Sequence, residues 1–353
     1  MKKIGMALSG IIIVAAVLYA VRAPLSTALM GRVLEHNMLG SAADSLSDGL
    51  DVILCGAGGP LPDPLRSGPC VAVIAGENVV IIDAGTGGAR NLGPLGLPVG
   101  QVDAVLLTHF HSDHIDGLGE LATLRWASSG HTEPLPVHGP EGVEEVVNGF
   151  NQSYALDAIY RNAHHGDAVA PLSGHGMQAI THPQPPEGEA VVVYENAGLT
   201  VKMIRVEHKP VEPAVAYLFE YKGRSALISG DTVKSANLQH FAQGVDLLVH
   251  EGLSPRLVQQ MNKAAVRAGN ENIAKITIDI PDYHTTPVEA AEIARDADVG
   301  HLLFYHVIPP TPLPGLKTAW LSGVDDVFDR YTLGEDGTGF SLPANSTEII
   351  PLD

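Results

Sequence analysis

Three histidines and an aspartate fall within six consecutive positions, from His109 to His114. A solvated loop rarely concentrates imidazoles in this way, and a packed core avoids unpaired polar clusters. In an extended chain, the alternating His109 and His111 can face one ion. A turn after them would aim Asp113 and His114 at a second position. Imidazole and carboxylate together suit zinc, with iron or manganese as alternatives, so this segment predicts a metal site.

Four apolar runs end directly on a residue that can bind a metal, namely His109, His208, Asp231 and His306. In open α/β folds, sites gather at strand ends, where rigid strands aim side chains from short loops. One such ending carries little weight, but four are hard to ascribe to chance. From Leu50 onward, short strand-like runs alternate with turns and helical patterns, which indicates a layered α/β domain.

Helical patterns cover Glu141–Gln152, Ser153–Asn162 and Val288–Ala297. Thr286 and Glu289 have the spacing of a capping box at the start of the last helix, with a proline in its first turn.

The composition permits a large core, because 45% of the 353 residues are hydrophobic and 17% are charged. The formal net charge of −19 repels the phosphates of nucleic acids. It does not exclude a small anionic substrate, since bound metal ions can invert the local field.

At the N-terminus, Lys2 and Lys3 precede an uncharged, mostly apolar stretch that ends at Val21. Its length is about that of a membrane span, and no small-x-small cleavage site follows. A buried N-terminal helix is the alternative. We expect an exported protein, in the periplasm or otherwise outside the cytoplasm, which this segment anchors to the inner membrane.

The chain then divides into residues 1–22 as a membrane anchor or signal segment, 23–49 as a polar stalk, 50–343 as the catalytic domain and 344–353 as a C-terminal tail. Cys55 and Cys70 flank a loop rich in glycine and proline. A single disulfide and two buried thiols both remain open for this pair.

The motif His-x-His-x-Asp-His at 109–114 is the signature of the metallo-β-lactamase superfamily, which the sequence resembles over nearly all of residues 50–310. The resemblance implies a four-layer αββα sandwich that binds two metal ions. It assigns one ion to His109, His111 and His208, and the other to Asp113, His114 and His306. Asp231 would bridge the two ions, and Asp83 would hydrogen-bond the metal-binding loop and orient its ligands.

Asp231 narrows this resemblance, because β-lactamases of the fold mostly have cysteine at the matching position. An aspartate there is typical of the phosphodiesterase, lactonase and sulfatase branches. The segments Leu54–Pro60, Val249–Gly252 and His284–Pro287 also resemble the ribonuclease Z branch, to which a zinc arylsulfatase subfamily is similar. That resemblance implies that His284 acts as acid or base near the leaving group and that Glu251 orients it. A loop histidine that caps a helix is the alternative for His284.

The chain departs from the ribonuclease branch in two ways. The residues that follow Glu251 and His306 differ from the usual pattern, and residues 162–200 contain no Lys or Arg. The ribonucleases carry a partly basic arm in this region that grips tRNA, and binding of a phosphate backbone needs cations. Nucleic acid is therefore not expected as the partner.

The sequence predicts hydrolysis of a small phosphate or sulfate ester by two zinc ions, with Asp113, His284 and Glu251 as the catalytic residues. The alternatives are a lactonase or β-lactam hydrolase of the same fold, a tRNA 3′-processing endoribonuclease, and a non-catalytic metal-binding protein of the cell envelope. Whether the chain forms a homodimer is left open.

Overall fold

The computed structural model describes residues 18–35 and 48–352, and the chain divides into two compact units, Met1–Ser45 and Leu46–Asp353. In the first unit, residues 18–35 form an exposed helix. No helix within the described ranges combines the length and the apolar character needed to span a membrane. Residues 1–17, which carry most of the predicted anchor, lie outside the described residues.

The second unit is built around two mixed β-sheets. The first has eight strands in the order β15-β14-β1-β2-β3-β4-β5-β6, and the second has seven in the order β13-β12-β11-β10-β9-β8-β7. The strands of the first sheet are β1 (Gly49–Gly56), β2 (Cys70–Ala75), β3 (Asn78–Ile82), β4 (Ala104–Leu106), β5 (Leu135–Gly139), β6 (Met177–Thr181), β14 (Gly339–Pro343) and β15 (Ile350–Leu352). Those of the second are β7 (Ala190–Asn196), β8 (Leu199–Arg205), β9 (Val215–Tyr221), β10 (Arg224–Ile228), β11 (Leu247–Leu253), β12 (His301–Ile308) and β13 (Tyr331–Leu333).

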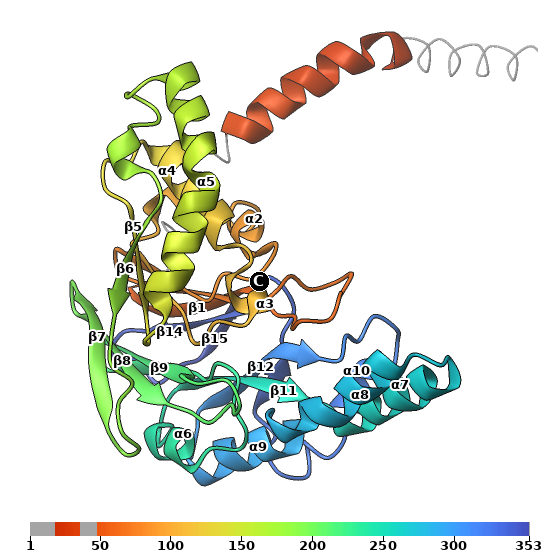
Figure 1. The fold of residues 1–353 in the computed structure, drawn as a ribbon. Coiled ribbons are helices and arrows are strands. Elements are labelled where there is room, and N and C mark those ends of the chain that lie inside the picture. The colour runs from red at the N-terminus through yellow and green to blue at the C-terminus, as the bar shows by residue number, and fades with distance from the viewer. Residues whose placement is uncertain (1–17, 36–47, 353) are drawn as a thin grey trace, which may run out of the picture. The chain divides into compact units, whose positions relative to one another are not determined.

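Helices cover the outer face of each sheet. Figure 1 shows α2, α4 and α5 on one side of the two sheets and α6, α9 and α10 on the other. The helices are α2 (Gly88–Leu92), α3 (Ser112–Ile115), α4 (Leu118–Ser129), α5 (Val143–His165), α6 (Ala236–Phe241), α7 (Pro255–Arg267), α8 (Glu271–Asp279), α9 (Pro287–Asp296) and α10 (Leu316–Trp320). The predicted αββα sandwich is thereby confirmed.

The alternation of side chains along β1 shows why two layers of core form. Leu50, Val52 and Leu54 belong to the core between the sheets, which also contains Tyr217 and Phe219 of β9. Ile53 and Cys55, on the other face of β1, pack in the core beneath α4 and α5. Successive residues of a strand point to opposite faces, so a strand that is apolar on both faces is covered on both sides.

Three local predictions have a structural outcome. Thr286 and Glu289 form the predicted capping box at the start of α9. Cys55 and Cys70 are joined by a disulfide, which ties the end of β1 to the start of β2. The segment predicted as a C-terminal tail, residues 344–353, includes β15, which pairs antiparallel with β14 at the edge of the first sheet.

Candidate metal centre

The metal-binding loop lies where parallel strands of the first sheet end. β3, β4 and β5 run parallel, so the loops that follow β3 and β4 emerge at the same edge. Asp83 follows β3 in a left-handed conformation, with φ 57°, and is fully buried. Its Oδ1 accepts a hydrogen bond from the Thr108 backbone N–H at 2.8 Å, and its Oδ2 lies 2.7 Å from Nδ1 of His114. One carboxylate therefore holds both ends of the loop that carries the histidines.

The second sheet supplies single residues from separate strand ends. β10, β11 and β12 are parallel. Asp231 follows the end of β10, and Glu251 lies within the last residues of β11. His306 is the extra residue of a β-bulge in β12, because Glu251 pairs with Tyr305 and Gly252 pairs with Val307. Its φ of 45° is unusual for a residue with a side chain. The bulge turns the imidazole toward the loop from the first sheet.

Four side chains form a first group whose ligand atoms lie within 4.8 Å of one another, namely His109, His111, His208 and Asp231. Nε2 of His208 is 3.4 Å from Nδ1 of His111 and 3.8 Å from Oδ2 of Asp231. Nδ1 of His208 lies 2.8 Å from the Tyr283 carbonyl oxygen, which fixes the ring so that Nε2 faces the group.

Asp113, His114 and His306 form a second group with the same spacing. Nε2 of His306 is 3.2 Å from Oδ2 of Asp113 and 3.4 Å from Oδ2 of Asp231. Nε2 of His114 is 3.4 Å from the other oxygen of Asp231. Asp231 thus lies between the two groups, with one or both carboxylate oxygens near each.

The unpaired polar atoms at this centre test whether a cation fits. Nε2 of His109, Nε2 of His114 and Oδ1 of Asp231 are buried and have no hydrogen-bond partner. Buried polar atoms are normally paired, because leaving one unpaired costs about 1–3 kcal/mol. These three atoms converge on the space between the two groups, where a divalent cation would satisfy them. The residues present therefore fit two metal ions.

The ionisation of His109 and Asp231 agrees with that fit. Burial lowers the pKa of His109 well below its usual value, and the neighbouring imidazoles lower it further. Burial raises the pKa of Asp231, but the charges of His306 and His114 outweigh it and hold the pKa well below its usual range. A neutral imidazole and an ionised carboxylate are the forms that ligate a metal. For His114, burial lowers the pKa, but the charges of Asp231, Asp83 and Asp113 outweigh it and raise the pKa well above its usual value, so a bound metal would have to displace that proton.

His284 and Glu251 lie next to these groups. Oε1 of the fully buried Glu251 is 3.1 Å from Nδ1 of His284 and accepts a hydrogen bond from the Thr285 backbone N–H at 2.8 Å. Burial lowers the pKa of His284, but the Glu251 carboxylate outweighs it and raises the pKa. Nδ1 of His284 is 4.0 Å from Oδ2 of Asp231. The structure thus brings every predicted site residue to one edge of the sandwich, although their roles stay predictions.

A cavity of about 410 Å³ opens beside the centre and is lined by His111, Asp113, Asp231 and His284. Pro60 and Ser112 also line it. Five further residues complete its lining, namely Leu61, Ile276, Ile280, Tyr283 and Ile308. We did not predict these residues, because isolated apolar residues in the sequence carry no signal of a site. Helices α7 and α8 were not predicted either, so nothing in the sequence placed Ile276 near His284.

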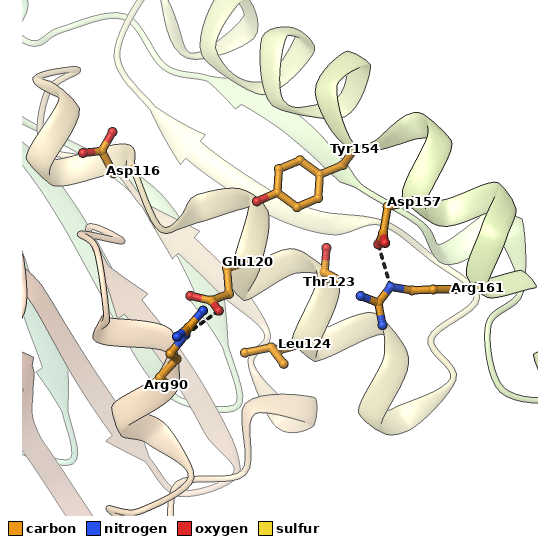
Figure 2. A pocket seen from close by; sticks show the side chains of 8 residues that line it. All are labelled: Arg90, Asp116, Glu120, Thr123, Leu124, Tyr154, Asp157 and Arg161. Atoms are coloured by element: carbon orange, nitrogen blue, oxygen red, sulfur yellow. Dashed lines mark hydrogen bonds and ion pairs between the residues drawn. The ribbon is translucent and has the colours of Figure 1, made fainter.

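A more distant cavity of about 360 Å³ lies between α4 and α5 (Figure 2). Two arginines line it, and both are held by carboxylates. Nε of Arg90 is 2.6 Å from Glu120, and Nε of Arg161 is 2.5 Å from Asp157. The cavity therefore offers little uncompensated positive charge.

The fold and the centre define a class of metal-dependent hydrolase, and comparison with known proteins agrees. Residues 63–276 match the family model described as metallo-beta-lactamase superfamily, and the chain belongs to that superfamily. The chain is 34% identical over 293 residues to the ribonuclease Z of Mycolicibacterium gilvum (strain PYR-GCK), which covers 81% of this chain and 94% of the relative. It is 34% identical over 290 residues to the ribonuclease Z of Mycobacterium bovis (strain BCG / Pasteur 1173P2), which covers 81% of this chain and 96% of the relative.

Solved structures agree with the fold. The short form of human tRNase Z matches with a TM-score of 0.58 and 22% identity, over 83% of this chain and 99% of that one. A diphosphatase of the PhnP family matches with a TM-score of 0.54 and 18% identity, over 84% of this chain and 98% of that one. At these identities the likeness concerns the fold alone.

The relatives correct one prediction and conflict with another. The expectation of an exported protein anchored to the inner membrane is wrong, since the curated relatives are ribonuclease Z enzymes that match over nearly their whole length. The part of the chain that the structure describes adds no helix able to span a membrane. The relatives' name also conflicts with the expectation that nucleic acid is not a partner.

Proposed function

We propose that this protein hydrolyses phosphodiester bonds with two metal ions, zinc in the first place, and that RNA is its substrate. The observation that carries the proposal is the His284–Glu251 pair, which adjoins Asp231. His284 lies with Asp231 and His306 in a third set of closely spaced ligand atoms, but each of the two metal groups has at least three ligands without it. A protein that only stores metal has no use for such a pair. The curated relatives, at 34% identity, support RNA as the substrate.

In this proposal, His109, His111 and His208 hold one ion, and Asp113, His114 and His306 hold the other. Asp231 would be available to both ions, and Asp83 keeps the loop in place. When bound, the two ions supply an activated water and stabilise negative charge on the phosphate.

The remaining step belongs to His284. Its Nδ1 is held by Glu251, so Nε2 is the nitrogen left to exchange a proton with the substrate. As water attacks phosphorus and the bond to the leaving oxygen breaks, this nitrogen gives its proton to that oxygen. The raised pKa of His284, which its Glu251 partner causes against the effect of burial, keeps the imidazole protonated closer to neutral pH.

A small phosphate or sulfate ester is the second candidate substrate, and the distribution of charge favours it. Residues 162–200 contain no Lys or Arg, and the net charge is −19. The guanidinium groups of Arg90 and Arg161 in Figure 2 are already paired with carboxylates. RNA binding through phosphates needs free cations, and a small ester does not.

The test is a substrate panel for the zinc-loaded full chain. It comprises a precursor tRNA with a 3′ extension, bis(p-nitrophenyl) phosphate and p-nitrophenyl sulfate. The proposal predicts cleavage of the precursor and of the phosphodiester, both lost in Asp231→Ala. Cleavage of the phosphodiester without the precursor would favour the second candidate. Hydrolysis of neither, with two ions bound, would refute the proposed function.

A further inference from the structure

The cavity at the metal centre has a lining of two chemical kinds. Its polar residues are His111, Ser112, Asp113, Asp231 and His284, and its apolar residues include Pro60, Leu61, Ile276, Ile280 and Ile308. We define the apolar wall as Leu61, Ile276, Ile280 and Ile308. Ile308 is 2% exposed and belongs to a small core cluster against which Leu61 and Ile280 pack. Three of the four wall residues are therefore held in the fold by this cluster, and α8 supplies the fourth, Ile276.

The wall adjoins the proposed proton donor. Ile280 begins the 3-10 turn Ile280–Asp282, and Tyr283 and His284 follow it directly in the chain. Ile280, Tyr283 and His284 line the same cavity. A group that gives its proton to the leaving oxygen lies on the leaving-group side of the substrate. The part of the substrate nearest the wall is thus the leaving alcohol.

The lining of this cavity also lacks a cationic side chain that could bind an anionic group on that alcohol. None of its described lining residues is Lys or Arg, so no side chain there is fitted to a further phosphate. Ile276 is 47% exposed, although it is a large apolar side chain. An apolar ligand group that covers this surface removes it from water, and this burial favours binding.

We infer that the apolar wall binds an aromatic ring carried by the leaving alcohol, an aryl group or a nucleobase. The cavity of about 410 Å³ has room for one such ring beside the phosphate. The inference rests on the proposed phosphodiester hydrolysis and adds to it the class of leaving group. A flat ring suits this cavity because three isoleucines supply apolar area and Tyr283 supplies an aromatic neighbour.

Ligand binding tests the wall independently of turnover. Calorimetry on the zinc-loaded full chain compares phenylphosphonate with methylphosphonate, which share the anionic group and differ only in the ring. Tighter binding of phenylphosphonate is expected. Ile276→Asn should reduce that preference about fivefold, roughly the effect of the apolar area lost from one side chain, and should leave methylphosphonate unchanged. Ile276→Ala should give a smaller reduction in the same direction.

The matched control is Ile278→Asn. Ile278 lies on the same helix, is 62% exposed, and is absent from the cavity lining. It should leave the preference for the ring unchanged. Thermal unfolding of each variant checks the fold, which these exposed positions should not disturb.

Turnover separates the two sources of the ring. For diesters whose aryl and alkyl leaving groups have matched acidity, Ile276→Asn should lower kcat/KM only for the aryl ester. For a short RNA, removal of the base on the leaving side should lower kcat/KM if the wall binds a nucleobase, and not if it binds an aryl group alone.

Equal binding of the two phosphonates would overturn the inference that the apolar wall binds a ring. So would an equal loss of the preference for the ring in Ile278→Asn and Ile276→Asn. Neither result would bear on phosphodiester hydrolysis. If the protein prefers the ring but hydrolyses no diester, the proposed function is overturned, and the inference that the apolar wall binds a ring remains.

Discussion

The two sheets contribute to the same centre in different ways. The first sheet supplies His109, His111, Asp113 and His114 from one loop, which the carboxylate of Asp83 holds. The second supplies His208, Asp231, Glu251, His284 and His306 from five separate places in the chain. The first contribution depends on local geometry, whereas the second depends on the register of several strands. A contiguous ligand set needs one anchor, but a dispersed set needs the whole sheet to be correctly assembled.

Removal of the residue that joins the two contributions should have the largest effect. Asp231→Ala should abolish measurable hydrolysis and leave at most one ion per chain, because both groups lose a carboxylate oxygen and the facing imidazoles repel one another. Metal content by mass spectrometry and activity against a phosphodiester measure it.

The control for this variant is Glu207→Gln. The Glu207 side chain is 59% exposed and adjoins His208 in the chain, where it pairs with Lys209 at the surface. This variant should keep both ions and full activity. Two ions and normal turnover in Asp231→Ala would contradict the shared role of Asp231.

His284→Ala comes next. It removes a residue that lies near Asp231 and His306 but outside the two metal groups described above. It should leave two ions bound and slow turnover by roughly 10²–10⁴-fold, the usual range for a lost acid or base. The loss should be greatest for poor leaving groups, which depend most on protonation. Glu251→Gln should give a milder version of the same pattern. An equal loss across esters of graded leaving-group acidity would mean that His284 is not the proton donor.

Asp83→Asn tests the single anchor of the first sheet and should have a smaller effect. An amide cannot accept hydrogen bonds from both ends of the loop, so the ligands lose their fixed orientation. Losses of this kind typically reach about 10–100-fold in metal affinity or activity. Zinc titration with a competing chelator measures the affinity. An unchanged affinity would show that the loop holds its shape without Asp83.

The same contrast explains how far the sequence predicts this protein. The first sheet's ligands are contiguous, so their chemistry is visible before any fold is known. The capping box at Thr286 is local in the same sense, and the structure has it. The bulge at His306 is not local, because it arises from a register shift between β11 and β12. The apolar wall brings Leu61 together with Ile276, and only tertiary packing brings such distant positions together.

The predicted helix boundaries were wrong where no residue in the sequence marks the end of a helix. Patterns at Glu141–Gln152 and Ser153–Asn162 predict two helices, but the structure has one, α5. Neither glycine nor serine at the expected break stops a helix as proline does. Gly149 has no atom within 4 Å of where its Cβ would be, so the helix runs through it without crowding.

The smallest expected effect concerns a second buried aspartate of the first sheet, which sharpens the contrast with Asp83. Asp51 lies on β1 opposite Ser341 and is 1% exposed, and its Oδ1 has no hydrogen-bond partner. Burial raises the pKa of Asp51 from 3.8 to about 6. Because the folded state resists ionisation, stability should fall as pH rises from about 4 to about 6, by at most about 3 kcal/mol. The Asp83 carboxylate is held by Thr108 and His114 and thereby positions the metal-binding loop. Ionisation of the buried Asp51 destabilises the folded protein and has no part in the metal centre.

Asp51→Asn should therefore stabilise the protein above pH 6 and have a much smaller effect near pH 4, where the carboxyl is neutral in the folded state and only about half ionised in the unfolded state. Urea unfolding at pH 4 and pH 8, with a chelator present so that metal loss at acid pH does not contribute, measures the difference. Asp326→Asn at the surface is the control and should be neutral at both values. A gain at pH 4 equal to that at pH 8 would mean that Asp51 is not ionised against the burial, and that the amide stabilises β1 through contacts of its own.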